Sequence, residues 1–228
     1  MARQGAALAT LIESELGDTR TLRVLDVACG IGTQALPLAA RGFRVTARDL
    51  SEGAVVRLRR EAAARRLGID AAVADMRRVS ETVAPGFDVV LAFDNSIPHL
   101  LSDGDLEATF REFRTVLRPG GLCLCSVRDY DAIERGRSLT ISYGERRRAG
   151  EIFRLRQEWT WEGTTHYEIA FVIEKDGAGG PVLVLRTVTR YYAVSVARLL
   201  ELMARAGFVD CRRLDETIYQ PILIGRAP

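Results

Sequence analysis

The sequence is poor in the residues that build metal centres and disulfides. It has four cysteines and two histidines in 228 residues, and no two cysteines are spaced as C-x-x-C. We therefore expect reduced thiols and no metal site, because a structural zinc needs four such ligands at characteristic spacings. Cys123 and Cys125 alternate with apolar residues in the run LCLCSV, which predicts buried strand positions rather than reactive thiols.

The chain also lacks a charge excess and a long apolar run. Lys and Arg number 32 against 30 Asp and Glu, and this balance gives no reason to expect a nucleic-acid partner. No stretch approaches the roughly 18 apolar residues that span a bilayer. Glu13 and Glu15 interrupt the segment where a secretory signal would have its apolar core. These features predict a cytoplasmic protein with no membrane partner.

Short apolar runs alternate with amphipathic stretches through the first half of the chain. This order is typical of a parallel sheet with helices on both faces, so the fold class is α/β and doubly wound. The pattern predicts helices over 3–16, 33–41, 52–67 and 105–117, and strands over 22–28, 43–48, 71–74, 87–93 and 122–127.

The composition and the pattern of residues change after Asp131. Residues 132–192 are rich in β-branched and aromatic residues, and turn signals between them predict a three-stranded antiparallel insertion, with Arg146 to Arg148 as a solvated turn. A helix over 195–206 and a strand over 218–225 follow. We expect a Rossmann-like domain over 1–131, the insertion over 132–192, and a C-terminal part over 193–228 that completes the main domain.

A glycine-rich turn follows the first predicted strand. In RVLDVACGIGTQA, Gly30, Gly32 and Ala35 have the spacing G-x-G-x-x-A between a strand and a helix. Glycine lets the backbone turn sharply and approach a ligand closely, which indicates a nucleotide-type ligand at the carboxyl end of the strand. Asp49 lies 19 residues after Gly30, where a carboxylate can accept hydrogen bonds from both ribose hydroxyls. This spacing suits NAD and S-adenosylmethionine equally.

Three further residues favour S-adenosylmethionine. Asp26 lies four residues before Gly30, where a carboxylate suits a ligand with an ammonium and a sulfonium better than a pyrophosphate. Asp75 follows the third strand and can accept from an adenine amino group while Met76 packs on the ring. Asp75 by itself could be a solvent-facing loop carboxylate, so the set carries the inference.

The same motifs, taken together, resemble the class I S-adenosylmethionine-dependent methyltransferases. The matching segments are DVACGIG (26–32), TARDLS (46–51), ADM (74–76), FDVVLAFDN (87–95) and VLRPGGLCL (116–124). The resemblance implies a Rossmann-like, mainly parallel seven-stranded sheet with a small antiparallel insertion after the fifth strand. It implies S-adenosyl-L-methionine as cofactor, S-adenosyl-L-homocysteine as product, and Ala28, Leu50 and Phe93 as further cofactor-binding residues.

A narrower resemblance, to the glycine and sarcosine N-methyltransferase group, rests on NSIPHL (95–100), SVRDYD (126–131) and TRYYAVS (189–195). It implies that Asn95, His99 and Arg128 line the substrate pocket, with Arg128 binding an amino-acid carboxylate. It also implies that Arg3 forms a salt bridge to the carboxylate of the cofactor.

The chemistry of these side chains agrees with such roles. Asn95 has a carbonyl that accepts from an amine and an amide that donates to a carboxylate, although it could instead cap a loop. His99 could orient the substrate or take a proton, or be structural. The planar guanidinium of Arg128 suits a carboxylate, and the alternative is a salt bridge to Asp129 or Asp131.

Aromatic residues of the insertion are predicted mainly to pack. Trp159 and Trp161 alternate with polar residues, which places both on one face of a strand, in the interior of the inserted sheet. Tyr192 is a candidate wall of the substrate site.

The sequence therefore predicts an enzyme that methylates a small molecule, first of all the amine of an amino acid such as glycine or sarcosine. N- or O-methylation of a natural-product intermediate is the alternative. An NAD-dependent dehydrogenase and a non-catalytic S-adenosylmethionine-binding module stay open, and a homo-oligomer is compatible with the sequence.

Overall fold

The computed structural model describes residues 2–17, 21–177 and 179–228, which divide into two compact units. The first unit is drawn from residues 1–97, 103–129 and 196–228, and the second from 98–102 and 130–195. The elements of the main sheet and its helices are α1 (Ala2–Leu16), β1 (Arg23–Asp26), α2 (Ala35–Ala39), β2 (Arg44–Asp49), α3 (Glu52–Ala64), β3 (Asp70–Val73), η1 (Met76–Glu81), β4 (Phe87–Ala92), η2 (Ile97–His99), α4 (Asp103–Val116), β5 (Leu117–Ser126), α5 (Val196–Arg205), β10 (Val209–Leu214) and β11 (Ile222–Arg226).

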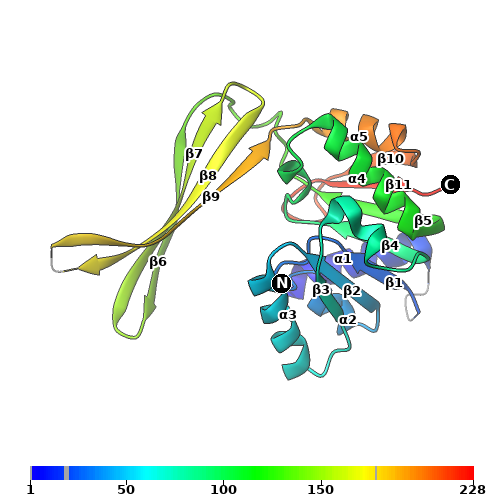
Figure 1. The fold of residues 1–228 in the computed structure, drawn as a ribbon, viewed down its shortest axis with the longest axis horizontal. Coiled ribbons are helices and arrows are strands. Elements are labelled where there is room, and N and C mark those ends of the chain that lie inside the picture. The colour runs from blue at the N-terminus through cyan, green and yellow to red at the C-terminus, as the bar shows by residue number, and fades with distance from the viewer. Residues whose placement is uncertain (1, 18–20, 178) are drawn as a thin grey trace. The chain divides into compact units, whose positions relative to one another are not determined.

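The first unit is built on a seven-stranded sheet with the order β10-β11-β5-β4-β1-β2-β3 (Figure 1). Strands β1 to β5 pair in parallel, whereas β11 and β10 are antiparallel to their neighbours. The order confirms the predicted doubly wound, mainly parallel seven-stranded sheet. The strand order reverses between β1 and β4, which is where open α/β sheets bind ligands.

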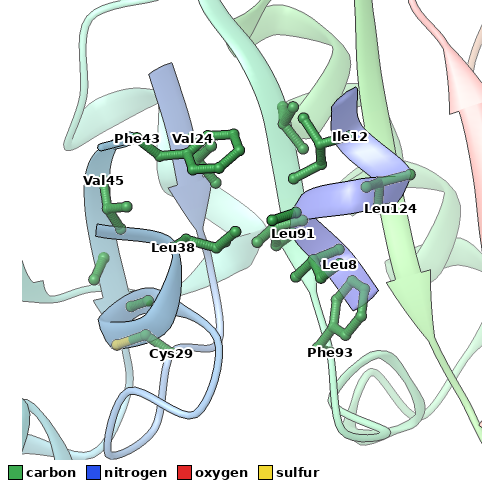
Figure 2. Close-up of a cluster of buried hydrophobic side chains, with 14 of the residues drawn as sticks. Leu8, Ile12, Val24, Cys29, Leu38, Phe43, Val45, Leu91, Phe93 and Leu124 are labelled. Atoms are coloured by element: carbon green, nitrogen blue, oxygen red, sulfur yellow. The ribbon is translucent and has the colours of Figure 1, made fainter. Parts of the chain in front are cut away.

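The core of this unit forms on both faces of the sheet. Leu8 and Ile12 of α1 are fully buried and lie among Leu91, Phe93 and Leu124 of the sheet region (Figure 2). All six residues of β4 are buried, as a strand covered by helices on both faces requires.

One strand of this sheet is absent from the sequence prediction. β10 reads VDCRRL, pairs only with β11, and is mostly exposed or half-buried. A bulged edge strand does not need an apolar face, so its sequence carries no alternation to detect. α2 is also shorter than the predicted 33–41, since its helical residues begin after Gln34.

The second unit is an antiparallel sheet of four strands, with the order β6-β7-β8-β9, not the three strands predicted. They are β6 (Leu139–Arg148), β7 (Glu151–Glu162), β8 (His166–Gly177) and β9 (Gly180–Tyr192). The error arose in β6, whose second half is Glu145 followed by the arginine run that we predicted as a turn. As an exposed edge strand with an irregular register near Gly144, β6 lacks the apolar pattern that marks a strand.

The predicted packing of the tryptophans is confirmed. Trp159 stacks on Tyr167 with ring centroids 4.8 Å apart, and Trp161 lies 5.0 Å from the same ring. Together with Tyr130 and Ile169 they form the small hydrophobic core of the second unit, which we call the tryptophan cluster.

Buried positions in β5 accommodate Cys123 and Cys125, as predicted. Burial raises the pKa of the Cys123 thiol well above its ordinary value, so this thiol is protonated at neutral pH. Within residues 2–17, 21–177 and 179–228, no group of His, Cys, Asp or Glu side chains is arranged to hold a metal ion. Over the same ranges, no helix is both long and apolar enough to cross a bilayer.

Candidate functional site

Four carboxylates follow the carboxyl ends of four neighbouring strands. Asp26 ends β1, Asp49 ends β2, and Asp75 and Asp94 come two residues after β3 and β4. Because these strands are parallel neighbours, their ends meet at one edge of the sheet. This edge therefore has an acidic character that suits a cationic ligand better than a phosphate.

The glycine turn connects β1 to α2 and is held to β2. The backbone nitrogen of Gly30 donates to Oδ2 of Asp49 at 2.7 Å, and the nitrogen of Cys29 donates to the carbonyl of Arg48 at 3.0 Å. Gly30 and Gly32 both have positive φ, +50° and +93°, which a Cβ disfavours. The two glycines thus fix a sharp turn against the end of β2.

The surroundings of the two glycines differ. A Cβ on Gly32 would lie 2.5 Å from Cδ1 of Leu58 and 2.9 Å from Cδ1 of Leu36, so this glycine is needed for packing. A Cβ on Gly30 would meet no atom within 4 Å. Space above Gly30 is therefore open to a ligand that approaches the backbone.

Asp26 is a buried carboxylate, and none of the ion pairs found among the described residues includes it. Its Oδ1 accepts a long hydrogen bond of 3.4 Å from the nitrogen of Ala28, and its Oδ2 has no hydrogen-bond partner in the described part of the chain. Burial, reinforced by the charges of Asp49 and Asp94, raises the pKa of Asp26 to about 8. An unsatisfied buried carboxylate oxygen is costly, and a positively charged ligand would satisfy it.

Asp49 is oriented by two backbone donors. In addition to Gly30, the nitrogen of Ser51 donates to its Oδ1 at 2.8 Å. Each carboxylate oxygen keeps a second lone pair, so both can still accept from ribose hydroxyls. Leu50, the next residue, is 65% exposed and offers an apolar surface at the same strand end.

Asp75 caps the short helix η1. Its Oδ1 accepts from the nitrogen of Arg77 at 2.9 Å, and the carboxylate also pairs with the Arg77 guanidinium. This guanidinium holds the pKa of Asp75 below its ordinary value. Met76 begins the helix and is half-buried. The predicted contact with adenine would have to share Asp75 with Arg77.

Asp94 was not predicted from the sequence and is the most connected of the four carboxylates. Its oxygens accept from Gln4 Nε2 of α1 and from Gln34 Nε2 before α2, each at 3.1 Å, and from the hydroxyl of Tyr219 at 2.9 Å. Its backbone nitrogen donates to Oγ of Ser126 at 2.8 Å. These three side-chain donors are neutral, so none of them places a positive charge beside Asp94.

The segment after β4 is joined to the segment after β5. Asn95 is buried, its Oδ1 accepts from the nitrogen of Arg128 at 2.9 Å, and its own nitrogen donates to the carbonyl of Ser126 at 3.0 Å. Asp94 and Asn95 have consecutive positive φ values, +57° and +65°. Non-glycine residues pay a steric cost in this region, and such strain is concentrated at functional sites.

The two aspartates that follow Arg128 each form an ion pair with a further arginine. Asp129 pairs with Arg213 at 2.8 Å, and Asp131 pairs with Arg135 at 2.9 Å. Arg128 itself is half-buried. Its placement after β5, bonded to Asn95, puts a guanidinium-bearing residue at the carboxyl edge of the sheet.

The remaining predicted residues belong to the second unit, to the hydrophobic core or to the part of the chain whose side chains are not described. His99 and Tyr192 belong to the second unit: the His99 ring lies 4.2 Å from that of Tyr191, and Tyr192 stacks on His166 at 5.0 Å. Phe93 has its side chain in the hydrophobic core beside Leu8 (Figure 2). The side chain of Arg3 lies outside the described part of the chain.

Comparison with known proteins indicates the family of the domain that contains this site. Residues 24–121, which include the glycine turn and all four carboxylates, match the model of a methyltransferase domain. Residues 24–121 therefore form a methyltransferase domain of the class I, S-adenosylmethionine-dependent type. The methyl donor of this family is S-adenosylmethionine. The match also decides against the dehydrogenase that the glycine spacing had left open.

The curated relatives of this chain are similar to it over part of their length. A glycine/sarcosine N-methyltransferase of Aphanothece halophytica is 33% identical over 111 residues, which cover 49% of this chain and 42% of that protein. A protein of the same name from Parasynechococcus marenigrum is 28% identical over 148 residues, covering 65% and 52%. The chain thus spans about half the length of the curated relatives it matches.

A solved structure is similar over the whole chain. CalS10, an amino pentose methyltransferase from Micromonospora echinaspora, matches with a TM-score of 0.83 and 17% identity, covering 100% of this chain and 91% of that one. At this level of identity the likeness shows the fold, including an insertion after β5.

The residues at the sheet edge fit S-adenosylmethionine. Asp26 offers an unsatisfied carboxylate oxygen to an ammonium, and Gly30 leaves room for a ligand to approach the turn. Asp49 offers acceptors for ribose hydroxyls, and the exposed side chain of Leu50 offers an apolar surface beside it. This set of donors and acceptors contains no site for a pyrophosphate, because carboxylates occupy the strand ends.

Proposed function

We propose that this methyltransferase acts on the amine of a small molecule that also carries a carboxylate, such as glycine or sarcosine. The hydrogen bond between Asn95 and Arg128 carries the proposal, since it fixes an amide and a guanidinium-bearing residue together after β4 and β5. An amide and a guanidinium recognise the amine and the carboxylate of an amino acid. The glycine/sarcosine N-methyltransferases that are similar over part of their length support the same substrate class.

The cofactor would be held by Asp26, the glycine turn, Asp49 and Leu50, with Asp75 and Met76 toward the adenine. S-adenosylmethionine supplies a methyl group on a positively charged sulfur, and S-adenosylhomocysteine remains after the transfer. The residues of the site have to align the acceptor, exclude water and keep the attacking amine neutral. Strong acid catalysis is not required of them.

Asp94 favours an amine acceptor on electrostatic grounds. It is an exposed carboxylate next to Asn95, oriented by Gln4, Gln34 and Tyr219. Such a group attracts an incoming ammonium and can accept the hydrogen bond of the amine that forms from it. His99 and Tyr192 stay sequence-based predictions of an orienting group and a pocket wall.

A second candidate is the amine of an amino sugar or another natural-product intermediate. It is favoured by the likeness to the amino pentose methyltransferase, which extends over the whole chain whereas the glycine/sarcosine relatives match about half of their own length. The two candidates share the amine and differ in the carboxylate, so Arg128 distinguishes them.

The test measures S-adenosylhomocysteine release by the purified protein with S-adenosylmethionine and, separately, glycine, sarcosine, dimethylglycine or an aminodeoxy sugar, against a blank without acceptor. We expect acceptor-dependent release with glycine or sarcosine. Arg128→Lys should then raise the KM for that acceptor about tenfold or more at unchanged cofactor affinity, because lysine cannot make the bidentate contact.

Two results would contradict the proposed substrate. Release with the amino sugar alone would replace the amino acid by the second candidate. Cofactor binding without release in any mixture would indicate the non-catalytic module, or an acceptor of another class.

A further inference from the structure

Asp94 is linked both to the segment proposed to hold the cofactor and to the residue proposed to bind the acceptor. Its Oδ2 accepts from Nε2 of Gln34, which leads from the glycine turn into α2, and the next residue along the chain is Asn95. Asp94 follows β4, beside the point where the strand order of the sheet reverses. An acceptor that reaches Asn95 therefore comes close to the carboxylate of Asp94.

The hydrogen bonds of the Asp94 carboxylate are divided unequally between its two oxygens. Oδ1 accepts from Nε2 of Gln4 at 3.1 Å and from the hydroxyl of Tyr219 at 2.9 Å. Over residues 2–17, 21–177 and 179–228, Oδ2 accepts only from Gln34, at 3.1 Å. Each carboxylate oxygen has two lone pairs. Oδ1 is therefore saturated, and Oδ2 keeps one position for a further donor.

Two consecutive residues before β11 hold Asp94 in place. Tyr219 binds the carboxylate through its hydroxyl, and Oε1 of Gln220 accepts from Oγ of Ser126 at 3.0 Å. The same Oγ accepts from the backbone nitrogen of Asp94 at 2.8 Å. Ser126 and Gln220 are both buried, so this anchor is shielded from water. The position of the Tyr219 side chain is thus tied to the ends of β4 and β5.

The ring of Tyr219 is exposed although its hydroxyl is bound. The residue is 72% exposed, so its ring is not a part of the hydrophobic core. An aromatic ring has a negative π-face that attracts cations and contacts alkyl groups. Held by its hydroxyl at Asp94, the ring offers this surface to a ligand that the carboxylate binds.

A secondary amine matches both features of this pair. In its neutral, attacking form it has one N–H, which fits the single open position on Oδ2, and two alkyl carbons, which a ring can contact. A primary amine brings a second N–H toward the ring, which is a weak acceptor. A tertiary amine has no N–H and leaves the open position on Oδ2 unfilled.

We propose that Asp94 and Tyr219 form the subsite for the acceptor amine, and that Tyr219 makes it selective for an amine that already carries one methyl group. The inference rests on the proposed amine acceptor and names its substitution. Sarcosine is then a better substrate than glycine or dimethylglycine. For an amino sugar, the N-methylamino compound is better than its parent.

The pair also suits the charge that the reaction creates. Methyl transfer forms an N–C bond from the lone pair of the amine while the C–S electron pair remains on sulfur, so the positive charge passes to nitrogen. The product ammonium keeps its N–H on Oδ2 of Asp94. Its charge faces a carboxylate and a π-face, and both of these stabilise a cation.

The test measures kcat/KM for glycine, sarcosine, an aminodeoxy sugar and its N-methyl derivative. Tyr219→Leu removes the ring, and we expect the ratio of methylated to parent amine to fall at least about threefold, through a loss with the methylated amine. Tyr219→Phe keeps the ring and opens a second acceptor position on Oδ1, so kcat/KM should rise for the parent amine. Comparing ratios between proteins cancels the intrinsic reactivities of the two amines.

Gln220→Met is the matched control, because it removes the acceptor of Ser126 but leaves the ring and the carboxylate oxygens in the subsite. It should lower kcat/KM for both members of a pair by the same factor. Circular dichroism verifies that each variant is folded. A ratio that Tyr219→Leu leaves unchanged, or that Gln220→Met changes equally, would overturn the selectivity assigned to Tyr219.

Failure of this inference is distinguishable from failure of the proposed substrate. The choice between the amino acids and the amino sugars tests the carboxylate, whereas the ratio within each pair tests the subsite. If neither pair is methylated, the proposed function fails. Titration of the four compounds into the S-adenosylhomocysteine complex, followed by NMR, then decides the inference: it is supported if the methylated member binds more tightly in the wild type but not in Tyr219→Leu, and overturned otherwise.

Discussion

The side-chain oxygen Oδ1 of Asn95 accepts a hydrogen bond of 2.9 Å from the backbone nitrogen of Arg128. The contact joins the segments after β4 and β5, 33 residues apart in the chain, at the carboxyl edge of the sheet. Asn95 is buried and has φ of +65°. It therefore has two structural tasks, one for its side chain and one for its backbone.

These two tasks can be separated by substitution. Asn95→Ala loses the hydrogen bond to the Arg128 nitrogen and adds backbone strain, and we expect the free energy of unfolding to fall by about 2–3 kcal/mol. Asn95→Gly loses the same bond but adopts the positive φ readily, so its loss should be smaller by about 1 kcal/mol. Urea unfolding without cofactor measures both, and equal stabilities of the two variants would contradict the backbone argument.

The glycine turn offers a test of where the cofactor lies. Gly30→Ala adds a methyl group into open space at the cost of about 1 kcal/mol of backbone strain, so the protein should fold. Its affinity for S-adenosylhomocysteine should fall at least about tenfold, because the methyl group keeps the ligand from the turn. Gly32→Ala drives a methyl group into Leu58 and Leu36 and should destabilise the fold itself.

Calorimetric titration and thermal unfolding, measured on both glycine variants, decide this point. A Gly30→Ala protein that binds the cofactor like the wild type would show that the ligand does not approach this turn.

Asp49 is expected to bind the ribose of the cofactor. Asp49→Ala should lower the affinity for S-adenosylmethionine by about 1–3 kcal/mol, since it leaves the ribose hydroxyls without an acceptor. Asp70→Ala is the matched control, because Asp70 lies at the opposite end of the neighbouring strand and pairs with Arg48. Titration calorimetry should show near-wild-type affinity for Asp70→Ala. Equal losses in both variants would mean that Asp49 acts through the stability of the sheet.

The parts that the sequence predicted correctly are those with local signals. β4 is a near-continuous apolar run, broken only by Asp88, and the glycine turn has its own spacing, so both could be located from neighbouring residues alone. β10 and β6 are edge strands with polar sequences, and one partner strand each is enough to hold them. Nothing in their composition distinguishes them from loops.

The surroundings of Asp94 show the same limit at the site. Its donors Gln4, Gln34 and Tyr219 are 90, 60 and 125 residues away, so only the folded sheet brings them together. The residue pattern FDN placed Asp94 at a strand end but gave no sign of these contacts. In contrast, Asp49 and Gly30 were predicted together because their spacing is fixed by one strand–helix–strand unit.

The unsatisfied carboxylate of Asp26 predicts an unusual dependence of stability on pH. Its pKa is about 8 in the folded protein and near 4 when unfolded. Between these values the folded state holds a proton that the unfolded state releases, so folding is penalised increasingly as the pH rises. Below about 4 and above about 8 both states carry the same charge, and the effect levels off.

The sign distinguishes Asp26 from Asp75, the carboxylate of the same edge that is paired with an arginine. Asp75, whose pKa is lowered by Arg77, stabilises the fold above its unfolded value and loses that contribution only in acid. Asp26→Asn removes the opposing effect, because an amide of the same shape carries no charge at any pH. The difference in unfolding free energy between Asp26→Asn and wild type should therefore grow by up to about 1.4 kcal/mol per pH unit between pH 5 and 8.

Urea unfolding of cofactor-free protein at pH 5, 6, 7 and 8 measures this difference, with Asp94→Asn as a second variant. Because the charge of Asp94 helps to raise the pKa of Asp26, removing that charge should lower the pKa of Asp26. The free energy of unfolding should then stop falling at a lower pH than in the wild type. S-adenosylmethionine should flatten the wild-type profile, since its positive charge stabilises the ionised form of Asp26. A wild-type profile parallel to that of Asp26→Asn would mean that water already satisfies the carboxylate, and it would remove the strongest argument for a cation at the end of β1.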